Sequence, residues 1–151
     1  MQATVLVADD DENIRDGVSW CLRSAGFRVL TAADGAEAVR RSGNASVDLF
    51  ILDLHMPNLD GAGAFAAIRA KPRFRATPIL FMTGQPNEVP AGEPVLAKPC
   101  AVEELLDAVR SMLAQPKPRS VRTPGRRAAA GSPRGSRKPA RFRLQVRRRE
   151  A

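Results

Sequence analysis

Three carboxylates, one hydroxyl and one lysine each stand at the end of a short apolar segment. They belong to Asp9, Asp10, Asp53, Thr83 and Lys98. Carboxylates that share a cleft repel each other, so either one keeps a proton or a cation lies between them. Oxygen ligands suit Mg²⁺, which binds a few carboxylates together with a phosphate group. A carboxylate beside such a cation can form an acyl phosphate, so the pattern predicts Mg²⁺-dependent phosphoryl transfer to Asp53.

The segments that end in these residues have the character of buried strands and alternate with helical patterns. The predicted strands are residues 3–8, 27–32, 48–52, 78–82 and 95–97, and the predicted helices are residues 14–25, 34–42, 60–70 and 102–113. Apolar strands between amphipathic helices indicate an α/β fold with a parallel sheet covered on both faces. Sites in such sheets lie beyond the carboxyl ends of the strands, where we expect the five side chains to meet.

One connection departs from this alternation. Only eleven residues, 84–94, separate Thr83 from Val95, and they include three prolines and two glycines. Proline removes a backbone donor and clashes with the preceding turn of a helix. We therefore expect a loop with at most one short turn in this connection.

Charge divides the 151 residues into two parts. Residues 1–115 carry 11 Lys and Arg against 15 Asp and Glu, a net charge of −4, and are long enough for one domain with a core. Residues 116–151 carry 13 Lys and Arg against one acid, a net charge of +12, and are rich in Pro, Gly, Ser and Ala. Such a composition buries too little apolar area to offset its ordering entropy, so we expect a disordered basic tail.

Three interpretations of this tail stay open. Its cations favour salt-sensitive, sequence-independent contact with nucleic acid. It is alternatively a solvated tail, or one that docks on an acidic partner, where the alternating Phe142, Leu144 and Val146 would form a short strand. An Arg/Pro/Ala/Gly/Ser bias is also typical of a GC-rich gene read out of frame. No DNA-binding fold is visible after residue 115, which disfavours a transcription factor.

The remaining composition points to a cytoplasmic protein. Two cysteines are too few for a disulfide framework; we expect Cys21 to be a core residue and Cys100 to serve packing or capping. No apolar run approaches the roughly 18 residues of a membrane span, and the N-terminus lacks the basic start of a signal peptide.

At its strand ends the chain resembles the receiver domain of two-component response regulators. The matching motifs, within about residues 3–115, are Val5-Leu6-Val7-Ala8-Asp9-Asp10-Asp11-Glu12, Leu52-Asp53-Leu54-His55-Met56-Pro57 with Asp60-Gly61, Thr83-Gly84, and Lys98-Pro99. The resemblance implies a flavodoxin-like (βα)5 doubly wound sheet of strand order 2-1-3-4-5, here with the fourth helix reduced or absent. It also implies that Asp53 accepts a phosphoryl group from a sensor histidine kinase or a histidine phosphotransferase.

The same resemblance implies a role for each site residue. Asp10 and Asp53 would ligate Mg²⁺ directly, together with the backbone carbonyl of His55, and Asp9 would act through water. Thr83 and Lys98 would bind the phosphoryl oxygens and take part in switching. Taken singly, each has an ordinary structural alternative: a strand-end acid, a β-branched strand residue or a surface lysine. Asp9 and Asp10 could instead cap the following helix, although Asp11 is the more natural cap.

Two features depart from the family pattern. Val95 stands where receivers usually carry an aromatic switch residue, three positions before the lysine, and the fourth helix is reduced. Phe81-Met82-Thr83-Gly84 resembles the Phe-Ala-Thr-Gly motif of a receiver subgroup associated with HWE-type histidine kinases. We therefore expect the response to phosphorylation to fall mainly in residues 84–97. His55 and Gln85 are candidates for tuning the dephosphorylation rate, His55 with its side chain at the solvent-exposed rim of the cleft.

The leading hypothesis is a single-domain response regulator that acts as a phosphorylation switch or phosphate shuttle. It would not be an enzyme with turnover, although it would assist its own phosphorylation and dephosphorylation. One alternative is a Mg²⁺-dependent phosphohydrolase with an aspartate nucleophile. Such enzymes generally need a second Asp two residues after the first, where this chain has His55. The other is a nucleic-acid-binding protein that uses the tail and is regulated by the receiver. The sequence leaves the oligomeric state open.

Overall fold

Five parallel strands form one sheet in the order β2-β1-β3-β4-β5, which confirms the predicted order. The computed structural model describes residues 2–116, so all but the first residue of the predicted tail lies outside the described residues. The strands are β1 (Thr4–Ala8), β2 (Arg28–Ala32), β3 (Leu49–Leu52), β4 (Ile79–Thr83) and β5 (Val95–Ala97). Every residue of β1, β3 and β4 is buried, as expected for central parallel strands covered on both faces.

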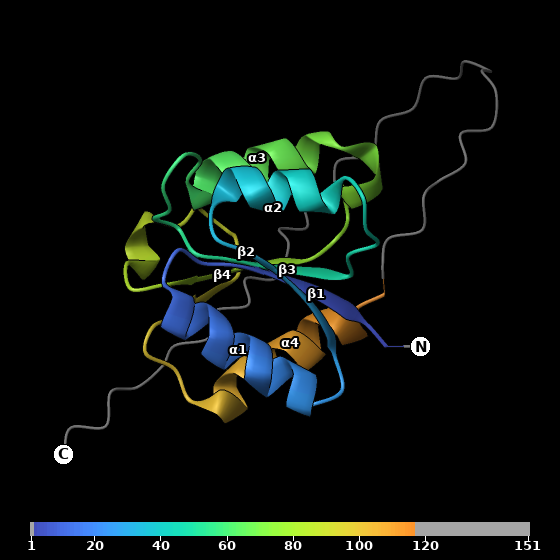
Figure 1. Ribbon diagram of the computed structural model, residues 1–151, viewed down its shortest axis with the longest axis vertical. Coiled ribbons are helices and arrows are strands. Elements are labelled where there is room, and N and C mark those ends of the chain that lie inside the picture. Colours follow the sequence, from blue (N-terminus) through green and yellow to red (C-terminus); the bar gives the residue numbers. More distant parts are fainter. Residues whose placement is uncertain (1, 117–151) are drawn as a thin grey trace, which may run out of the picture.

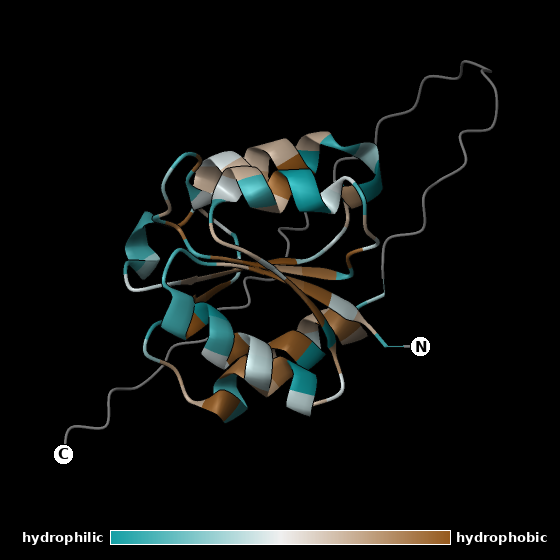
Figure 2. Ribbon diagram, in the orientation of Figure 1, coloured by the Kyte–Doolittle hydropathy of each residue, from teal (hydrophilic) through white to brown (hydrophobic). Residues whose placement is uncertain are grey.

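Four α-helices cover the two faces of the sheet in the described part of the chain. They are α1 (Glu12–Ser24), α2 (Gly35–Ser42), α3 (Gly61–Ala70) and α4 (Val102–Ala114). Helices α2 and α3 lie on one face, and α1 and α4 lie on the other (Figure 1). Hydrophobic residues colour the strands and the inner sides of the helices, whereas hydrophilic residues mark the outer sides (Figure 2). Among residues 2–116, no helix is both long and apolar enough to span a bilayer.

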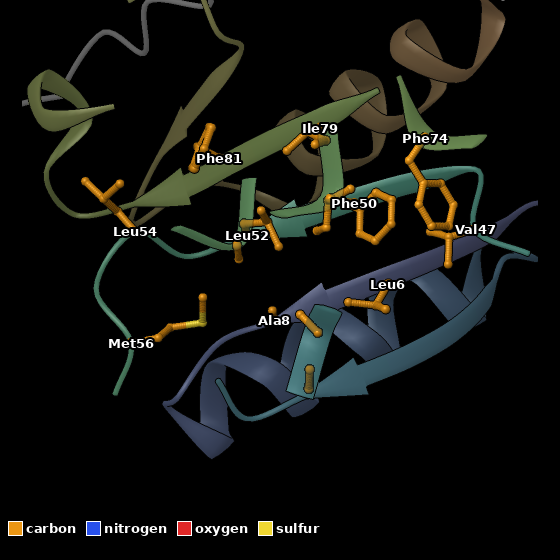
Figure 3. Close-up of a cluster of buried hydrophobic side chains, with 14 residues drawn as sticks. Leu6, Ala8, Val47, Phe50, Leu52, Leu54, Met56, Phe74, Ile79 and Phe81 are labelled. Atoms are coloured by element: carbon orange, nitrogen blue, oxygen red, sulfur yellow. The ribbon is translucent and has the colours of Figure 1, made fainter. Parts of the chain in front are cut away.

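Strand side chains alternate between two hydrophobic cores. Val5 and Val7 belong to the core under α1 and α4, whereas Leu6 and Ala8 belong to the core under α2 and α3. The second core is drawn in Figure 3, where Phe50 of β3 meets Phe74 edge-on at a centroid distance of 5.1 Å. The period-2 pattern of each buried strand therefore fixes which helix pair covers which side.

Local signals set the ends of the first helix. The side chain of Asp11 accepts hydrogen bonds from the backbone N–H groups of Asn13 and Ile14 at 2.9 and 3.3 Å, which confirms Asp11 as the cap. Gly26, with φ of 95°, follows the end of the helix. Its N–H and that of Phe27 donate to the carbonyls of Arg23 and Leu22 at 3.0 Å, a pairing that needs a left-handed residue at Gly26.

The connection from β4 to β5 contains only a single 3-10 turn, η2 (Pro86–Glu88), which confirms the reduced fourth helix. A second 3-10 turn, η1 (Pro72–Phe74), was not predicted. Beside it, the ammonium of Lys71 donates to the carbonyl of Val39 at 3.0 Å, and the guanidinium of Arg73 donates to that of Ser42. These distant cations satisfy carbonyls at the C-terminus of α2, where the helix dipole favours positive charge.

Candidate active site at the carboxyl ends of the strands

The ends of β1 and β3 bring the three acids together. Ala8 and Leu52 are partners in the sheet, and the backbone N–H of Asp53 donates to the carbonyl of Ala8 at 2.9 Å. Carboxylate oxygens of Asp9, Asp10 and Asp53 all lie within 4.8 Å of one another. Asp9 and Asp53 are buried and Asp10 is exposed, so the cluster opens to solvent through Asp10.

Lys98 reaches two of these acids from the end of β5. Its ammonium lies 2.5 Å from the carboxylate of Asp9 and 3.6 Å from that of Asp53. Its backbone N–H donates to the carbonyl of Thr83 at 2.8 Å, which ties the lysine to the end of β4. The Lys98–Pro99 peptide bond that follows is cis. The structure therefore places one cation among three acids, a net excess of negative charge.

This excess of negative charge is reflected in the protonation of Asp53. Burial raises the pKa of the Asp53 carboxyl above its ordinary value, and the charge of Asp9 raises it further. Lys98 and the backbone N–H of Leu54, which donates to Asp53 at 2.8 Å, oppose this rise. A hard divalent cation would relieve the repulsion, and a donor set made only of carboxylate oxygens fits Mg²⁺. The residues present therefore suit the metal that the sequence predicted.

Two glycines allow close backbone contacts between the loops of the site. A Cβ atom on Gly61 would stand 2.2 Å from the carbonyl oxygen of Asp53, and the N–H of Gly61 donates to the carbonyl of Leu54 at 2.8 Å. A Cβ atom on Gly35 would stand 2.2 Å from the carbonyl oxygen of Leu59. The starts of α3 and α2 can approach the loop after Asp53 this closely only because both residues lack a side chain. The sequence marked Gly61 as part of a motif but gave no sign of this contact.

Thr83 and Val95 lie on the other side of the site. Thr83 is fully buried, and its hydroxyl accepts a hydrogen bond from the backbone N–H of Gln85 at 3.1 Å. Val95 pairs with Phe81 in the sheet, is half-buried and packs against the core under α2 and α3. Phe65 of α3 packs on Phe81 at a centroid distance of 5.7 Å. An aliphatic side chain thus occupies the position at which the family pattern has a ring.

His55 pairs with a residue that the sequence did not suggest. Its imidazole lies 2.7 Å from the carboxylate of Glu88 in η2, and both side chains are more than half exposed. This contact joins the loop after β3 to the connection between β4 and β5. Residues 33 positions apart carry no local signal for such a pair. Ligation of a metal by the backbone carbonyl of His55 stays a prediction.

Comparison with known proteins decides the family. Residues 5–110 match the model of the response regulator receiver domain. The chain belongs to this family. The receiver domain is 35% identical over 114 residues to the transcriptional regulatory protein PrrA of Mycobacterium leprae, an alignment that covers 72% of this chain and 49% of PrrA. The chain thus spans about half the length of the first curated relatives it matches.

Solved receiver structures share the fold. The chemotaxis response regulator CheY4 of Vibrio cholerae is 35% identical, with a TM-score of 0.67, over 74% of this chain and 99% of CheY4. The receiver domain of sensor histidine kinase PA1611 from Pseudomonas aeruginosa is 28% identical, with a TM-score of 0.71, over 76% and 100% of the two chains. That structure has a magnesium ion coordinated in its active site cleft.

Proposed function

We propose that this receiver domain is cytoplasmic and accepts a phosphoryl group on Asp53 from the phosphohistidine of a sensor histidine kinase or histidine phosphotransferase. The observation that carries the proposal is the approach of the Asp9, Asp10 and Asp53 carboxylates to within 4.8 Å, with Lys98 contacting two of them. The domain would act as a phosphorylation switch or a phosphate shuttle in two-component signalling.

The chain supplies the nucleophile and its charge balance. A carboxylate oxygen of Asp53 attacks phosphorus, the phosphorus–nitrogen bond of the phosphohistidine breaks, and the histidine leaves with the bonding electrons. Asp53 must be ionised to react, and the nearby Lys98 favours its ionised form. Asp10, Asp53 and the backbone carbonyl of His55 would hold Mg²⁺, with Asp9 acting through water. The chemistry that Mg²⁺ supplies there is neutralisation of charge on the phosphoryl oxygens.

Lys98 and Thr83 would respond to the phosphorylation of Asp53. A phosphoryl group on Asp53 offers new acceptor oxygens to the hydroxyl of Thr83 and to the ammonium of Lys98, which contacts Asp9 in this structure. A Thr83 hydroxyl that turns toward the phosphoryl group gives up its contact with the N–H of Gln85 at 3.1 Å. This exchange would transmit phosphorylation to residues 84–97. Gln85 and His55, which flank the cleft, would tune the lifetime of the acyl phosphate.

Intact mass measurement after incubation with acetyl phosphate and Mg²⁺ tests the proposal. We expect the protein to gain one phosphoryl group, Asp53→Asn to gain none, and removal of Mg²⁺ by a chelator to prevent the gain. Asp107→Asn, which removes an exposed acid of α4, is the matched control and should be phosphorylated like the wild type. Equal phosphorylation of Asp53→Asn and the wild type would refute the assignment of Asp53.

A further inference from the structure

An open apolar groove lies between α1 and α4, beside the candidate site. Its volume is about 420 Å³, and Lys98 is among its lining residues. The other lining residues include Ile14, Gly17 and Cys21 of α1 and Pro99, Val102 and Leu105 on the opposite lip. The two helices that form the groove lie side by side on the same face of the sheet (Figure 1).

The lining of this groove is apolar apart from Lys98. Trp20 and Val102 are the large hydrophobic residues that the described part of the chain leaves exposed, at 70% and 47%. Val102 lines the groove, whereas Trp20 is not among the lining residues. Exposed apolar surface gathered at a concave site is typical of a binding site.

The C-terminal part of this chain has matching chemistry. Residues 141–149, Arg-Phe-Arg-Leu-Gln-Val-Arg-Arg-Arg, combine three apolar side chains at alternate positions with five arginines. Acids contact lining residues on both lips of the groove: the side chain of Asp11 accepts a hydrogen bond from the N–H of Ile14 at 3.3 Å, and that of Glu104 accepts one from the N–H of Ala101 at 3.2 Å. A segment with apolar anchors between cations therefore complements an apolar groove between acids.

The length of the intervening chain suits an intramolecular contact. Helix α4 has 13 residues, so the chain must return about 20 Å from its end to reach the groove near Val102 and Leu105. The 25 residues 116–140 span about 25–30 Å on average if they behave as a Gly-rich chain. A connection whose average length matches the distance gives a local concentration in the millimolar range, so even a weak contact would be populated.

We propose that residues 141–149 dock on the α1–α4 groove of the same molecule, with Phe142, Leu144 and Val146 in the groove and the arginines against the acids of its lips. Because Lys98 lines the groove, a docked segment lies beside the strand-end acids and competes with any protein that approaches the site over α1. This proposal concerns binding alone and does not depend on phosphorylation of Asp53.

Alkylation of the two thiols that line the groove tests the docking in the full chain. Cys21 and Cys100 are both free and half-buried, and the modification of each by N-ethylmaleimide is followed by peptide mass spectrometry. The test variant carries Phe142→Ser, Leu144→Ser and Val146→Ser, which keep every charge. We expect both thiols of the variant to react about tenfold faster, as for a contact of about 0.1 mM affinity at millimolar local concentration. Ala128→Ser, Ala129→Ser and Ala130→Ser form the matched control and should react like the wild type.

A substitution in the groove provides a second, independent test of the docking. A Cβ atom on Gly17 meets nothing within 4 Å, so both Gly17→Ala and Gly17→Lys can be accommodated. Lysine would repel the arginines, so the tail substitutions should have no further effect in a Gly17→Lys background but keep their effect in Gly17→Ala. Equal alkylation rates in the wild type and the tail variant would overturn the proposal. Protection that disappears on dilution would also overturn it, because the occupant would then be a second copy.

Discussion

Two regions of the site differ in how they are packed. At the ends of β1 and β3, Asp9 and Asp53 are buried and in close contact with neighbouring backbone, whereas the turn in the connection from Thr83 to Val95 is exposed. Asp9 and Asp53 are 1% and 8% exposed, and Gly61 packs directly on the backbone of Asp53. The turn η2 has no buried residue, and its contact with the loop after β3 is the exposed His55–Glu88 pair. We call these regions the acceptor side and the loop side.

This difference in packing suits two different requirements, a fixed nucleophile and a segment that responds to phosphorylation. A nucleophile that must meet a donor in line benefits from a backbone that cannot shift, because small misplacements cost much of the rate. A segment that must respond to a new charge has to come from the less stable part of the fold. The acceptor side has the first property and the loop side has the second. In this chain the loop side also lacks the aromatic residue and the regular helix of the family pattern.

The largest expected contrast comes from adding one methyl group on each side. Gly61→Ala forces a Cβ atom to within 2.2 Å of the Asp53 carbonyl oxygen, whereas a Cβ atom on Gly84 meets nothing within 4 Å. We expect Gly61→Ala to lower the free energy of unfolding by about 3 kcal/mol, since overpacking against backbone forces a shift. Gly84→Ala should stay within about 0.5 kcal/mol of the wild type. Urea unfolding measures both, and similar losses for the two variants would abolish the comparison.

Neutralising Asp53 should stabilise the acceptor side in the absence of metal. Its folded pKa is raised above 3.8 by burial and by Asp9, so the folded state binds a proton more tightly than the unfolded state. The wild type therefore loses stability as the pH rises from about 4 through that raised pKa. At pH 7 we expect Asp53→Asn to be more stable by about 0.5–2 kcal/mol, a typical gain when a strained functional group is removed.

Unfolding of both proteins between pH 3 and pH 7 provides the check. The difference should vanish near the lower end of this range, where Asp53 is protonated in both states. Asp107→Asn is the exposed control and should show no comparable gain. A variant Asp53→Asn that is less stable than the wild type at pH 7 would contradict the repulsion among the strand-end acids.

Added Mg²⁺ should reduce the stability advantage of Asp53→Asn over the wild type. A ligand that binds only the folded state at ten times its dissociation constant stabilises the protein by about 1.4 kcal/mol. We expect this gain for the wild type, and a much smaller one for Asp53→Asn, which has lost a charged ligand. Thermal unfolding at increasing Mg²⁺ concentration measures it. An equal rise in Tm for both proteins would place the metal elsewhere.

The smallest effect is expected from the contact that spans the two sides. Glu88→Gln removes the charge that faces His55 at 2.7 Å, but both side chains are more than half exposed. Exposed ion pairs contribute little, so the free energy of unfolding should change by less than about 0.5 kcal/mol. A loss above 1 kcal/mol in urea unfolding would show that the loop side is held more firmly than its exposure suggests.

The acceptor side was largely predictable from the sequence. A run of apolar residues that ends in an acid places the acid at the carboxyl end of a buried strand, as at Asp9 and Asp53. The resemblance to receivers added the strand order, and the prolines of residues 84–94 predicted the missing helix. Local patterns carry these features, because alternation, caps and turn residues act over a few positions.

Contacts between distant residues were not predictable in this way. The sequence assigned Lys98 to a phosphoryl group, but it does not show that the ammonium contacts the carboxylate of Asp9 at 2.5 Å. The approach of Gly61 to the Asp53 backbone and the pairing of His55 with Glu88 depend on how loops from different strands meet. Each is set by the packing of the whole sheet, which no short stretch of sequence encodes.

Backbone amide NMR with and without beryllofluoride and Mg²⁺, an acyl-phosphate mimic, tests the division of the site most directly. Shifts at Asp53 and Leu54 would report that the mimic is bound. We then expect the remaining large changes to fall mainly in residues 84–97, with small changes in the core residues of β1, β3 and α3. A bound mimic that leaves residues 84–97 unchanged would contradict the account.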